Sequence, residues 1–398
     1  MRPDVRPGGT LLRDTAFLRL WIGATASGLA TWALPFVLGF AVLERSMTAV
    51  ELGVVLAART VGFLVAVPVA GVLADRHSRR RVVFWAGSVA GLTSPLIAVG
   101  LGRSVVVMAV AAAAVGAGQG ACRPAFQALT AEVVAEEQRR RANAAMTLAV
   151  RVTTLVAPGL TALLALVVDT PALIVATAVL WLAAASIPPP GTAVVPAARR
   201  RFAAEFVDGV REARRHPWFV AGLGALTAVI ATGYSATGVV LPLVSRDRYG
   251  TGAVLAAAMT AYTVGALGGA IIAGRRGSRA QGWTALAGLA CYGFVPLTLL
   301  LPVHAVFVIG AYVAAGVGIE LFNVPWFTAT QREVEPSMLA RVSSLDFLLS
   351  YGLAPVGLAL IAPAIDGFGA DVVLAVCAVV CFAAPAAAAL VPSARDFR

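Results

Sequence analysis

Long apolar runs alternate with short polar segments along almost the whole chain. The first part holds apolar runs near residues 16–43, 50–74, 81–101, 103–128, 142–168 and 171–188. The second part holds further runs near residues 218–245, 251–275, 280–301, 304–329, 340–365 and 370–392. An apolar α-helix needs about 20 residues to cross the hydrocarbon core of a bilayer. The pattern therefore predicts an all-α membrane protein with twelve transmembrane helices.

The composition also indicates that most of the protein surface faces lipid rather than water. Hydrophobic residues make up 59% of the 398 residues and charged residues 13%, with a mean hydropathy of +0.86. Because a soluble domain usually carries about a quarter of charged residues, this chain is too poor in charge to cover a water-facing surface. All 31 basic residues are arginine, and this bias, with abundant Ala, Val and Gly, indicates GC-rich codon usage and a bacterial source.

A polar stretch at residues 191–217 is predicted to be a cytoplasmic linker between helical regions at residues 1–190 and 218–398. The stretch follows Pro188–Pro190 and includes Arg199–Arg201. Most arginines fall in alternate connections between the predicted spans. The other set of connections holds Arg45, Arg103, Arg246 and Arg248. Since positive charge gathers on the cytoplasmic side, both termini are predicted to be cytoplasmic, and the net charge of +11 is a topology signal rather than a nucleic-acid surface.

An internal repeat links the two regions. Residues 124–133 and 325–334 share Pro, Phe, Ala, Glu and Val at a constant offset of 201, and the same offset carries Arg140 onto Arg341. Both segments lie at the end of the fourth predicted span of their region. Many secondary transporters are built from two equivalent halves around a site near the bilayer midplane. The repeat therefore predicts two related helical bundles.

The connection between the second and third spans carries a family motif. Residues 71–81 read Gly-Val-Leu-Ala-Asp-Arg-His-Ser-Arg-Arg-Arg, which resembles the Gly-x-Leu-Ala-Asp-Arg-x-Gly-Arg-Arg signature of the major facilitator superfamily, with Ser78 in place of the second glycine. The resemblance implies a major facilitator fold of two pseudo-symmetric six-helix bundles that works by alternating access. It also implies a conformational latch formed by Gly71, Asp75, Arg76, Arg79 and Arg80, in which Asp75 locks the halves together. In the alternative interpretation, the arginines only fix topology.

Three further segments are similar to the branch of this superfamily that contains macrolide and siderophore (enterobactin-type) exporters. They are Phe17–Trp21, Glu205–Arg215 and Arg341–Leu345. Ala157-Pro158-Gly159 partly resembles the antiporter motif of many exporters. These resemblances imply proton-coupled efflux of a small amphipathic molecule such as a drug or siderophore. Uptake of a metabolite, or a non-transporting sensor on the same fold, remain alternatives.

Carboxylates inside predicted spans are candidates for proton coupling, because a buried charge is costly in the membrane and usually faces protein or a wet cavity. Glu320 lies in the middle of a span and is the first candidate. A structural ion pair with an arginine is its alternative role. Asp346 lies nearer a span end and is the second candidate, with an interfacial position or a pair with Arg341 as alternatives.

Other polar and aromatic residues are candidates for lining a substrate cavity. Gln119, Arg123 and Gln127 share one helix face, and the offset of 201 places Gln119 at the position of Glu320. Arginines in spans either bind an anionic substrate group or neutralise acids, whereas the aromatic residues either contact ligand or pack. The predicted cavity residues are Trp32, Arg59, Gln119, Arg123, Arg151, Tyr234, Asn323 and Trp326, with Phe322 as a further aromatic candidate.

The sequence offers little to support an enzyme or a metalloprotein. Cys122, Cys291, Cys377 and Cys381 lie in apolar segments, and no histidine neighbours a cysteine, so neither a disulfide framework nor a metal site is predicted. A nucleotide-binding loop needs a lysine that this chain lacks. We therefore expect no cofactor, a small-molecule substrate, protons as coupling ion, and a monomer in a bacterial plasma membrane.

Overall fold

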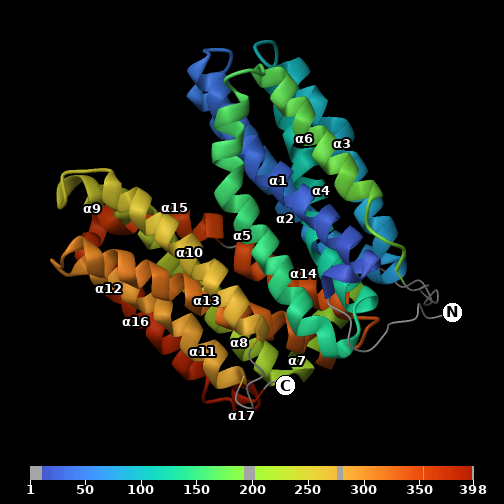
Figure 1. Cartoon of the computed structure of the whole chain (residues 1–398). Helices are drawn as coiled ribbons and strands as arrows, with labels where there is room; N and C mark the ends of the chain where they lie inside the picture. The colour runs from blue at the N-terminus through green and yellow to red at the C-terminus, as the bar shows by residue number, and fades with distance from the viewer. Residues whose placement is uncertain (1–10, 192–201, 276–280, 353, 397–398) are drawn as a thin grey trace. The chain divides into compact units, whose positions relative to one another are not determined.

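The computed structural model describes residues 11–191, 202–275, 281–352 and 354–396, and every regular element within these ranges is a helix (Figure 1). The first elements are η1 (Leu11–Arg13), α1 (Thr15–Leu43), α2 (Ala49–Arg76), α3 (Arg79–Gly100), α4 (Val105–Val133), η2 (Glu136–Gln138), α5 (Arg139–Leu164), α6 (Thr170–Ser186) and α7 (Phe202–Arg215). They are followed by α8 (Pro217–Val229), η3 (Ile230–Tyr234), α9 (Ser235–Asp247), α10 (Ala253–Arg275), α11 (Gln281–Ala290), η4 (Cys291–Gly293) and α12 (Phe294–Leu300). The last elements are α13 (Ala305–Glu333), α14 (Leu339–Gly352), α15 (Ala354–Phe368), α16 (Ala370–Ala388) and α17 (Pro392–Arg395).

Ten helical segments of the described chain are long and apolar enough to cross a membrane. In lipid each backbone N–H and C=O must be satisfied within the segment, so continuous helices are the expected solution. Two further predicted spans fall below this standard. The segment Thr170–Ser186 is apolar but shorter, and the run at 340–365 is divided into α14 and α15 around residue 353, which lies outside the described residues. The protein is therefore a multi-pass, all-helical membrane protein.

Polar caps define where several spans begin. Asp14 accepts hydrogen bonds from the backbone N–H groups of Ala16 and Phe17 at the start of α1. Thr48 and Glu51 form a capping box at the start of α2, and Ser78 caps α3. Such caps satisfy backbone donors that the first helical turn leaves without a partner. They mark the edges of the apolar runs, which is why the predicted and observed helix ends differ by only a few residues.

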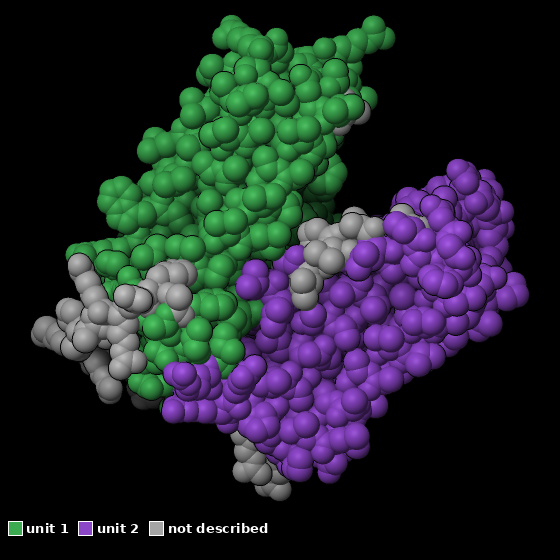
Figure 2. Space-filling model, turned by 180° about the vertical axis from the view of Figure 1, so that it is seen from behind, with its two compact units in different colours: residues 1–210, 335–345 green, residues 211–334, 346–398 purple. Residues whose placement is uncertain are grey.

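The chain divides into two compact units, which Figure 2 shows in different colours. Unit 1 comprises residues 1–210 and 335–345, and unit 2 comprises residues 211–334 and 346–398. In unit 1, α4 packs against α2 and α3, α6 packs against α1 and α3, and α5 packs against α1. The boundary between the units falls inside α14, between Leu345 and Asp346.

Unit 2 repeats the packing order of unit 1. Here α13 packs against α10, α11 and α12, and α16 packs against α8, α11 and α12. In addition, α15 packs against α9. The positions of α2, α3, α4 and α6 are thus taken by α10, the α11–α12 pair, α13 and α16. This correspondence agrees with the sequence repeat at an offset of 201.

Small residues bring the central helices of each unit into close contact. A Cβ atom on Gly116 of α4 would lie 1.9 Å from the carbonyl oxygen of Arg59 in α2. A Cβ atom on Gly316 of α13 would lie 2.1 Å from the carbonyl oxygen of Tyr262 in α10. Interfaces between membrane helices are enriched in small residues because close backbone approach increases van der Waals contact. The same device therefore operates at equivalent helix pairs of both units.

The predicted linker contains a helix that the sequence pattern did not reveal. Helix α7 lies within the stretch 191–217, of which residues 192–201 are outside the described residues. One face of α7 is buried, with Glu205 and Glu212 both less than a tenth exposed, whereas Val207 is about half exposed. Charged and apolar residues alternate at helical spacing along α7, so the helix is amphipathic and contains no continuous apolar run of the kind that marks a membrane span.

Candidate functional site

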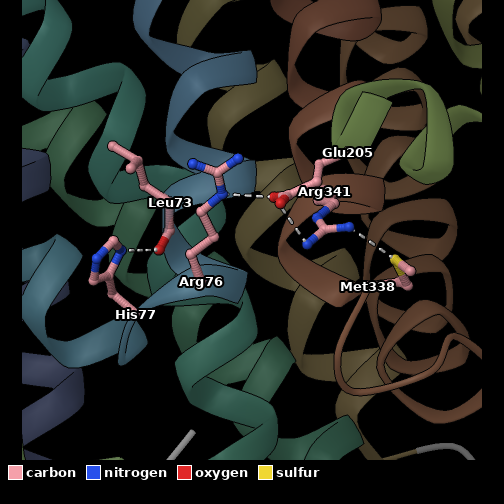
Figure 3. A network of polar contacts seen from close by, with 6 residues as sticks. All are labelled: Leu73, Arg76, His77, Glu205, Met338 and Arg341. Atoms are coloured by element: carbon pink, nitrogen blue, oxygen red, sulfur yellow. Dashed lines mark hydrogen bonds and ion pairs between the residues drawn. The ribbon is translucent and has the colours of Figure 1, made fainter. Parts of the chain in front are cut away.

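Helices α2, α7 and α14 bring together an ionic network within unit 1 (Figure 3). Arg76, the last residue of α2, donates from Nε to Oε2 of Glu205 over 2.7 Å. Arg341, near the start of α14, donates from Nη2 to the same oxygen over 3.4 Å. Two guanidinium groups therefore share one carboxylate oxygen, and this oxygen connects segments that are more than a hundred residues apart in sequence.

Burial makes this network more costly to break than an ordinary surface ion pair. Glu205 is 5% exposed and Arg341 is 8% exposed, while the Arg76 side chain is about a quarter exposed. The hydrogen bond to Glu205 raises the pKa of Arg76 above its ordinary value. Charge-assisted hydrogen bonds of this kind are short and roughly twice as strong as neutral ones. Since removal of one partner from a buried pair leaves an uncompensated charge, the network resists separation of the three segments.

Gly71 allows α2 to approach the start of α14. A Cβ atom at this position would lie 2.4 Å from Oγ of Ser344 and 3.0 Å from the carbonyl oxygen of Ala340. All three residues belong to unit 1. Any side chain at residue 71 would therefore push the two helices apart, about one and a half turns before Arg76, so glycine is the residue that fits this contact.

Arg79 forms a second ionic contact at the start of α3. Its Nη1 donates to Oε1 of Glu132 over 2.7 Å, and both side chains are less than a tenth exposed. Its Nη2 donates to the backbone carbonyl of Pro336, which precedes α14. Glu132 is one of the positions that the internal repeat retains in segment 124–133. Its carboxylate lies next to the first turn of α3, where Arg79 is its partner. Arg79 thus holds α3, α4 and the segment before α14 together.

The predicted latch residues do not all take part in this arrangement. Arg80 points elsewhere and donates from Nε to the carbonyl oxygen of Pro188 over 2.8 Å and from Nη2 to that of Ser186 over 3.0 Å. The backbone of Asp75 lies in α2, but its side chain is outside the described residues, as are residues 276–280 of the equivalent connection in unit 2. The role predicted for Asp75 therefore remains a prediction.

A second polar cluster lies between α1, α2 and α4 of unit 1. Arg59 of α2 donates from Nη2 to Oε1 of Gln119 over 2.7 Å and to the carbonyl oxygen of Thr31 over 2.8 Å. The guanidinium carbon of Arg123 lies 5.9 Å from the ring centroid of Phe63. The structure thus joins two predicted cavity residues directly and places two arginines in one electrostatic neighbourhood. Trp32 of α1 and Arg151 of α5, also predicted for the cavity, are half-buried.

The other predicted coupling and cavity residues lie in unit 2. Glu320 of α13 is completely buried at 0% exposure, and Asn323, one turn later, is 5% exposed. Both lie in the middle of the candidate span Ala305–Glu333. A carboxyl at this depth is costly unless its environment is polar or it takes up a proton. Placement at mid-span agrees with the sequence prediction that Glu320 lies in the middle of a span.

Asp346 is buried beside an aromatic side chain and a hydroxyl group. Its Oδ2 accepts a hydrogen bond from Nε1 of Trp326 over 3.1 Å, and its Oδ1 accepts one from the hydroxyl of Ser350 over 3.1 Å. Trp326 is 0% exposed and stacks on Phe322 and Phe219, with ring centroids 5.2 and 4.8 Å away. Trp326 therefore fixes the carboxyl of Asp346 while forming part of a packed aromatic cluster.

Tyr234 is the most exposed of the predicted cavity residues. It lies at the end of the π-helix η3, is 49% exposed, and its ring centroid lies 6.3 Å from that of Tyr292. The hydroxyl of Tyr292 shares a 2.9 Å hydrogen bond with the hydroxyl of Thr237. A π-helical turn often marks a functional position because it re-aims the side chains around it. Tyr234 is thus presented on the surface of unit 2 by an irregular helix.

Sequence reasoning did not assign site roles to Glu205, Glu132 or Tyr292. Glu205 was named only as part of a segment that resembles the exporter branch. Its two arginine partners lie 129 and 136 residues away in sequence, so no local pattern connects them with Glu205. Glu132 carried a signal, because it is one of the five positions that the repeat retains. Tyr292 lies in a turn of helix with no polar neighbour in sequence. Its partner Thr237 lies in α9, 55 residues away in sequence.

Comparisons with known proteins agree with this architecture. The family model described as the Major Facilitator Superfamily matches residues 20–357. The fold is similar to the crystal structure of the human organic anion transporter MFSD10 (TETRAN), with a TM-score of 0.73 and 15% identity, covering 94% of this chain and 99% of that one.

It is also similar to a bacterial homologue of the iron transporter ferroportin, solved in an outward-facing state with soaked iron. The TM-score is 0.71 at 14% identity, and the match covers 94% of this chain and 98% of that one. No curated protein matches the sequence. The two solved structures share the fold with this chain over nearly their whole length.

Proposed function

Because the chain belongs to the Major Facilitator Superfamily, whose members related in structure are membrane transporters, we propose that it exports a small amphipathic molecule by alternating access, driven by protons. Proton-coupled uptake of a metabolite is the second candidate, and a non-transporting sensor on the same fold is the third. The direction of transport distinguishes the first two. Transport itself distinguishes both from the third.

Complete burial of Glu320 is the observation that carries proton coupling. A charge in the middle of a transmembrane helix costs about 2.5 to 3.5 kcal/mol on insertion scales, so such residues are kept for pairing or function. Glu320 sits at the position equivalent to Gln119 in the internal repeat. A carboxyl that takes up and releases a proton during the cycle alternates between a neutral form, which tolerates burial, and a charged form, which requires water. Asp346, also buried, is the second candidate for this role.

The arginine cluster of unit 1 favours a substrate with an anionic or acceptor-rich group. Arg59 and Arg123 lie near one another, and Gln119 orients the Arg59 guanidinium. Guanidinium groups bind carboxylates and phosphates through paired N–H donors. Siderophores and many organic anions offer such acceptors on an otherwise apolar body. The solved relative MFSD10 is an organic anion transporter, which is compatible with this substrate class.

The network of Arg76, Glu205 and Arg341 is suited to act as a latch that opens once in each transport cycle. It joins the end of α2 to α7 and to the first turn of α14, and α14 is the helix that continues into unit 2. Motion of α14 requires these charge-assisted contacts to break or to move together. Asp75 is proposed to contribute to the same latch from the preceding residue of α2.

The remaining features of the proposal concern placement in the membrane. We propose twelve spans in two six-helix bundles, with α14 and α15 together forming one span and Thr170–Ser186 another. Both termini and the predicted linker are assigned to the cytoplasm by the arginine distribution. The predicted location is a bacterial plasma membrane, and the functional unit is a monomer.

An accumulation assay tests the function directly. The chain is expressed in a bacterium that lacks its own efflux pumps, and accumulation of drugs and siderophores is measured with and without an uncoupler. Proton-driven export predicts lower accumulation in expressing cells and restoration by the uncoupler. Higher, uncoupler-sensitive accumulation of a metabolite would favour the uptake alternative. Equal accumulation across both panels, with protein present in the membrane, would contradict transport and favour a sensor.

A further inference from the structure

A basic depression lies on unit 1 and is lined by none of the three residues of the Arg76 network. Its volume is about 300 Å³. Three arginines, one aromatic ring and two prolines line it: Arg19, Arg80, Arg81, Phe84, Pro188 and Pro190. These residues come from the first two turns of α1 and α3 and from the segment after α6. All three helix ends meet here because α1 and α3 run in one direction and α6 runs in the other.

Backbone carbonyls at the end of α6 hold two of the arginines in place. Arg19 donates from Nε to the carbonyl oxygen of Ile187 over 2.8 Å. Arg80 donates to the carbonyl oxygens of Pro188 and Ser186, as described above. The last carbonyls of a helix have no partner within the helix, so they are natural acceptors for such side chains. The guanidinium groups are thus positioned by neutral oxygens, which leave their charge uncompensated.

The positive charge of the depression has no acidic partner in the described part of the chain. None of Arg19, Arg80 and Arg81 forms an ion pair with a described carboxylate, and Nη1 of Arg80 is a buried nitrogen without a hydrogen-bond acceptor. A buried donor that lacks an acceptor costs about 1 to 3 kcal/mol. A bound anion supplies the missing negative charge to the exposed guanidinium groups of Arg19 and Arg81, and the N-terminus of α3 adds favourable electrostatics for it.

The apolar side of the depression indicates where the anion comes from. The ring of Phe84 lies 5.8 Å from the guanidinium carbon of Arg80 and is 40% exposed. Trp85, the next residue, is 65% exposed. Aromatic residues are enriched at the level of lipid headgroups, and both residues lie in the first two turns of the candidate span Arg79–Gly100. The depression therefore combines a charged floor with an apolar rim at the edge of a membrane helix.

We propose that this depression binds the phosphate group of an anionic phospholipid from the leaflet at which α1 and α3 begin. Arg80 and Arg19 contact the phosphate, Arg81 adds long-range attraction, and Phe84 and Pro190 lie against the glycerol and the first methylene groups. The arginines of the family motif then serve two tasks. Arg76 and Arg79 form ionic contacts inside the protein, whereas Arg80 and Arg81 attach the same loop to lipid.

Native mass spectrometry of the intact, detergent-solubilised chain tests the proposal. The protein is titrated separately with phosphatidylglycerol, with phosphatidylcholine of the same acyl chains, and with inorganic phosphate. We expect one tightly retained phosphatidylglycerol, weaker phosphatidylcholine and no competition by phosphate at equal concentration. Since a basic residue near an anionic membrane surface contributes about 1 kcal/mol, each of Arg80→Gln and Arg81→Gln should weaken phosphatidylglycerol binding about fivefold.

Two variants control for misfolding and for a nonspecific effect of removing positive charge. Arg81 is exposed and forms no described side-chain contact with the fold, so Arg81→Gln keeps the test valid if Arg80→Gln is unstable. Arg141→Gln removes an exposed arginine at the start of α5 and should bind phosphatidylglycerol like the wild type. Equal loss in Arg141→Gln, or wild-type binding in Arg81→Gln, would overturn the proposal. So would saturation of the site by inorganic phosphate with no preference between the two lipids.

Discussion

Nε1 of Trp326 donates a hydrogen bond to Oδ2 of Asp346 over 3.1 Å, and both side chains are buried in unit 2. The indole is locked by stacking on Phe219 and Phe322, so the donor keeps a fixed direction. A buried carboxyl needs such fixed donors, because water is not available to replace them. The aromatic cluster therefore fills space in unit 2 and also holds the hydrogen-bond donor of Trp326 in place for Asp346.

Trp326→Phe should lower the stability of the protein. Phenylalanine retains part of the stacking but removes the N–H donor, which leaves Asp346 with the Ser350 hydroxyl as its described donor. An acceptor left unsatisfied in a buried site costs about 1 to 3 kcal/mol. Thermal unfolding in detergent measures the effect. Trp181→Phe is the matched control, because the indole nitrogen of Trp181 is fully buried without a hydrogen-bond partner in the described chain. An equal drop in both variants would show that the lost ring volume, and not the hydrogen bond, matters.

Glu320→Gln should abolish proton-coupled transport while the protein still folds. Glutamine keeps the size and hydrogen-bonding capacity of the side chain but does not exchange a proton. Reconstituted protein with a pH-sensitive dye inside the vesicles reports proton movement upon addition of a transported substrate. Asp366→Asn, which neutralises an exposed carboxylate of the same unit, should behave as the wild type. Wild-type proton movement in Glu320→Gln would remove Glu320 from the coupling mechanism.

Glu205→Gln should weaken the contact between α2, α7 and α14. The substitution leaves Arg76 and the buried Arg341 without the carboxylate that they share, and hydrogen bonds to charged groups contribute about 1.5 to 3 kcal/mol each. We expect a lower unfolding temperature and a changed turnover rate at unchanged substrate affinity. Glu136→Gln removes an exposed acid near the start of α5 and serves as control. If turnover and stability match the control, the latch role of this network is wrong.

Gly71→Ala should disturb the same region by steric pressure. The added methyl group would lie 2.7 Å from Cβ of Ser344, so one helix must move. Overpacking of this kind typically costs about 1 to 3 kcal/mol. Gly53→Ala is a matched control on the same helix, because a Cβ atom there meets no other atom within 4 Å. Transport assays and thermal unfolding of the two variants should therefore separate. Similar behaviour of both would indicate that α2 and α14 are not held closely in the membrane.

A cysteine at Thr251 should react with a membrane-impermeant reagent from outside the cell. Thr251 is exposed in the connection between α9 and α10, on the side that holds few arginines. Cys291, the half-buried native cysteine, is replaced by alanine to lower the background. A cysteine at Glu136, in the connection between α4 and α5, should react only after the membrane is opened. The reverse pattern would invert the topology.

The sequence alone determined the membrane class, the positions of most helices and the similarity between α4 and α13. Lipid cannot satisfy backbone polar groups, so each span must be a nearly continuous apolar helix, and its signal is local in sequence. The arginines are likewise distributed according to the membrane, because positive charge gathers in the cytoplasmic connections. The repeat at an offset of 201 predicted that α4 and α13 are equivalent, and the packing of these two helices agrees with it. These features depend on runs of residues rather than on any single contact.

Only the tertiary structure decided which side chains meet. Arg79 and Arg80 are adjacent in sequence and looked alike, yet one pairs with Glu132 and the other lines a basic depression with Arg19. Glu205 gained its importance from Arg76 and Arg341, which lie far away along the chain. A charged side chain is defined by its partner, and the partner is selected by helix packing that no local pattern encodes. The same reason explains why the contact between Asp346 and Trp326 was not predicted from the sequence.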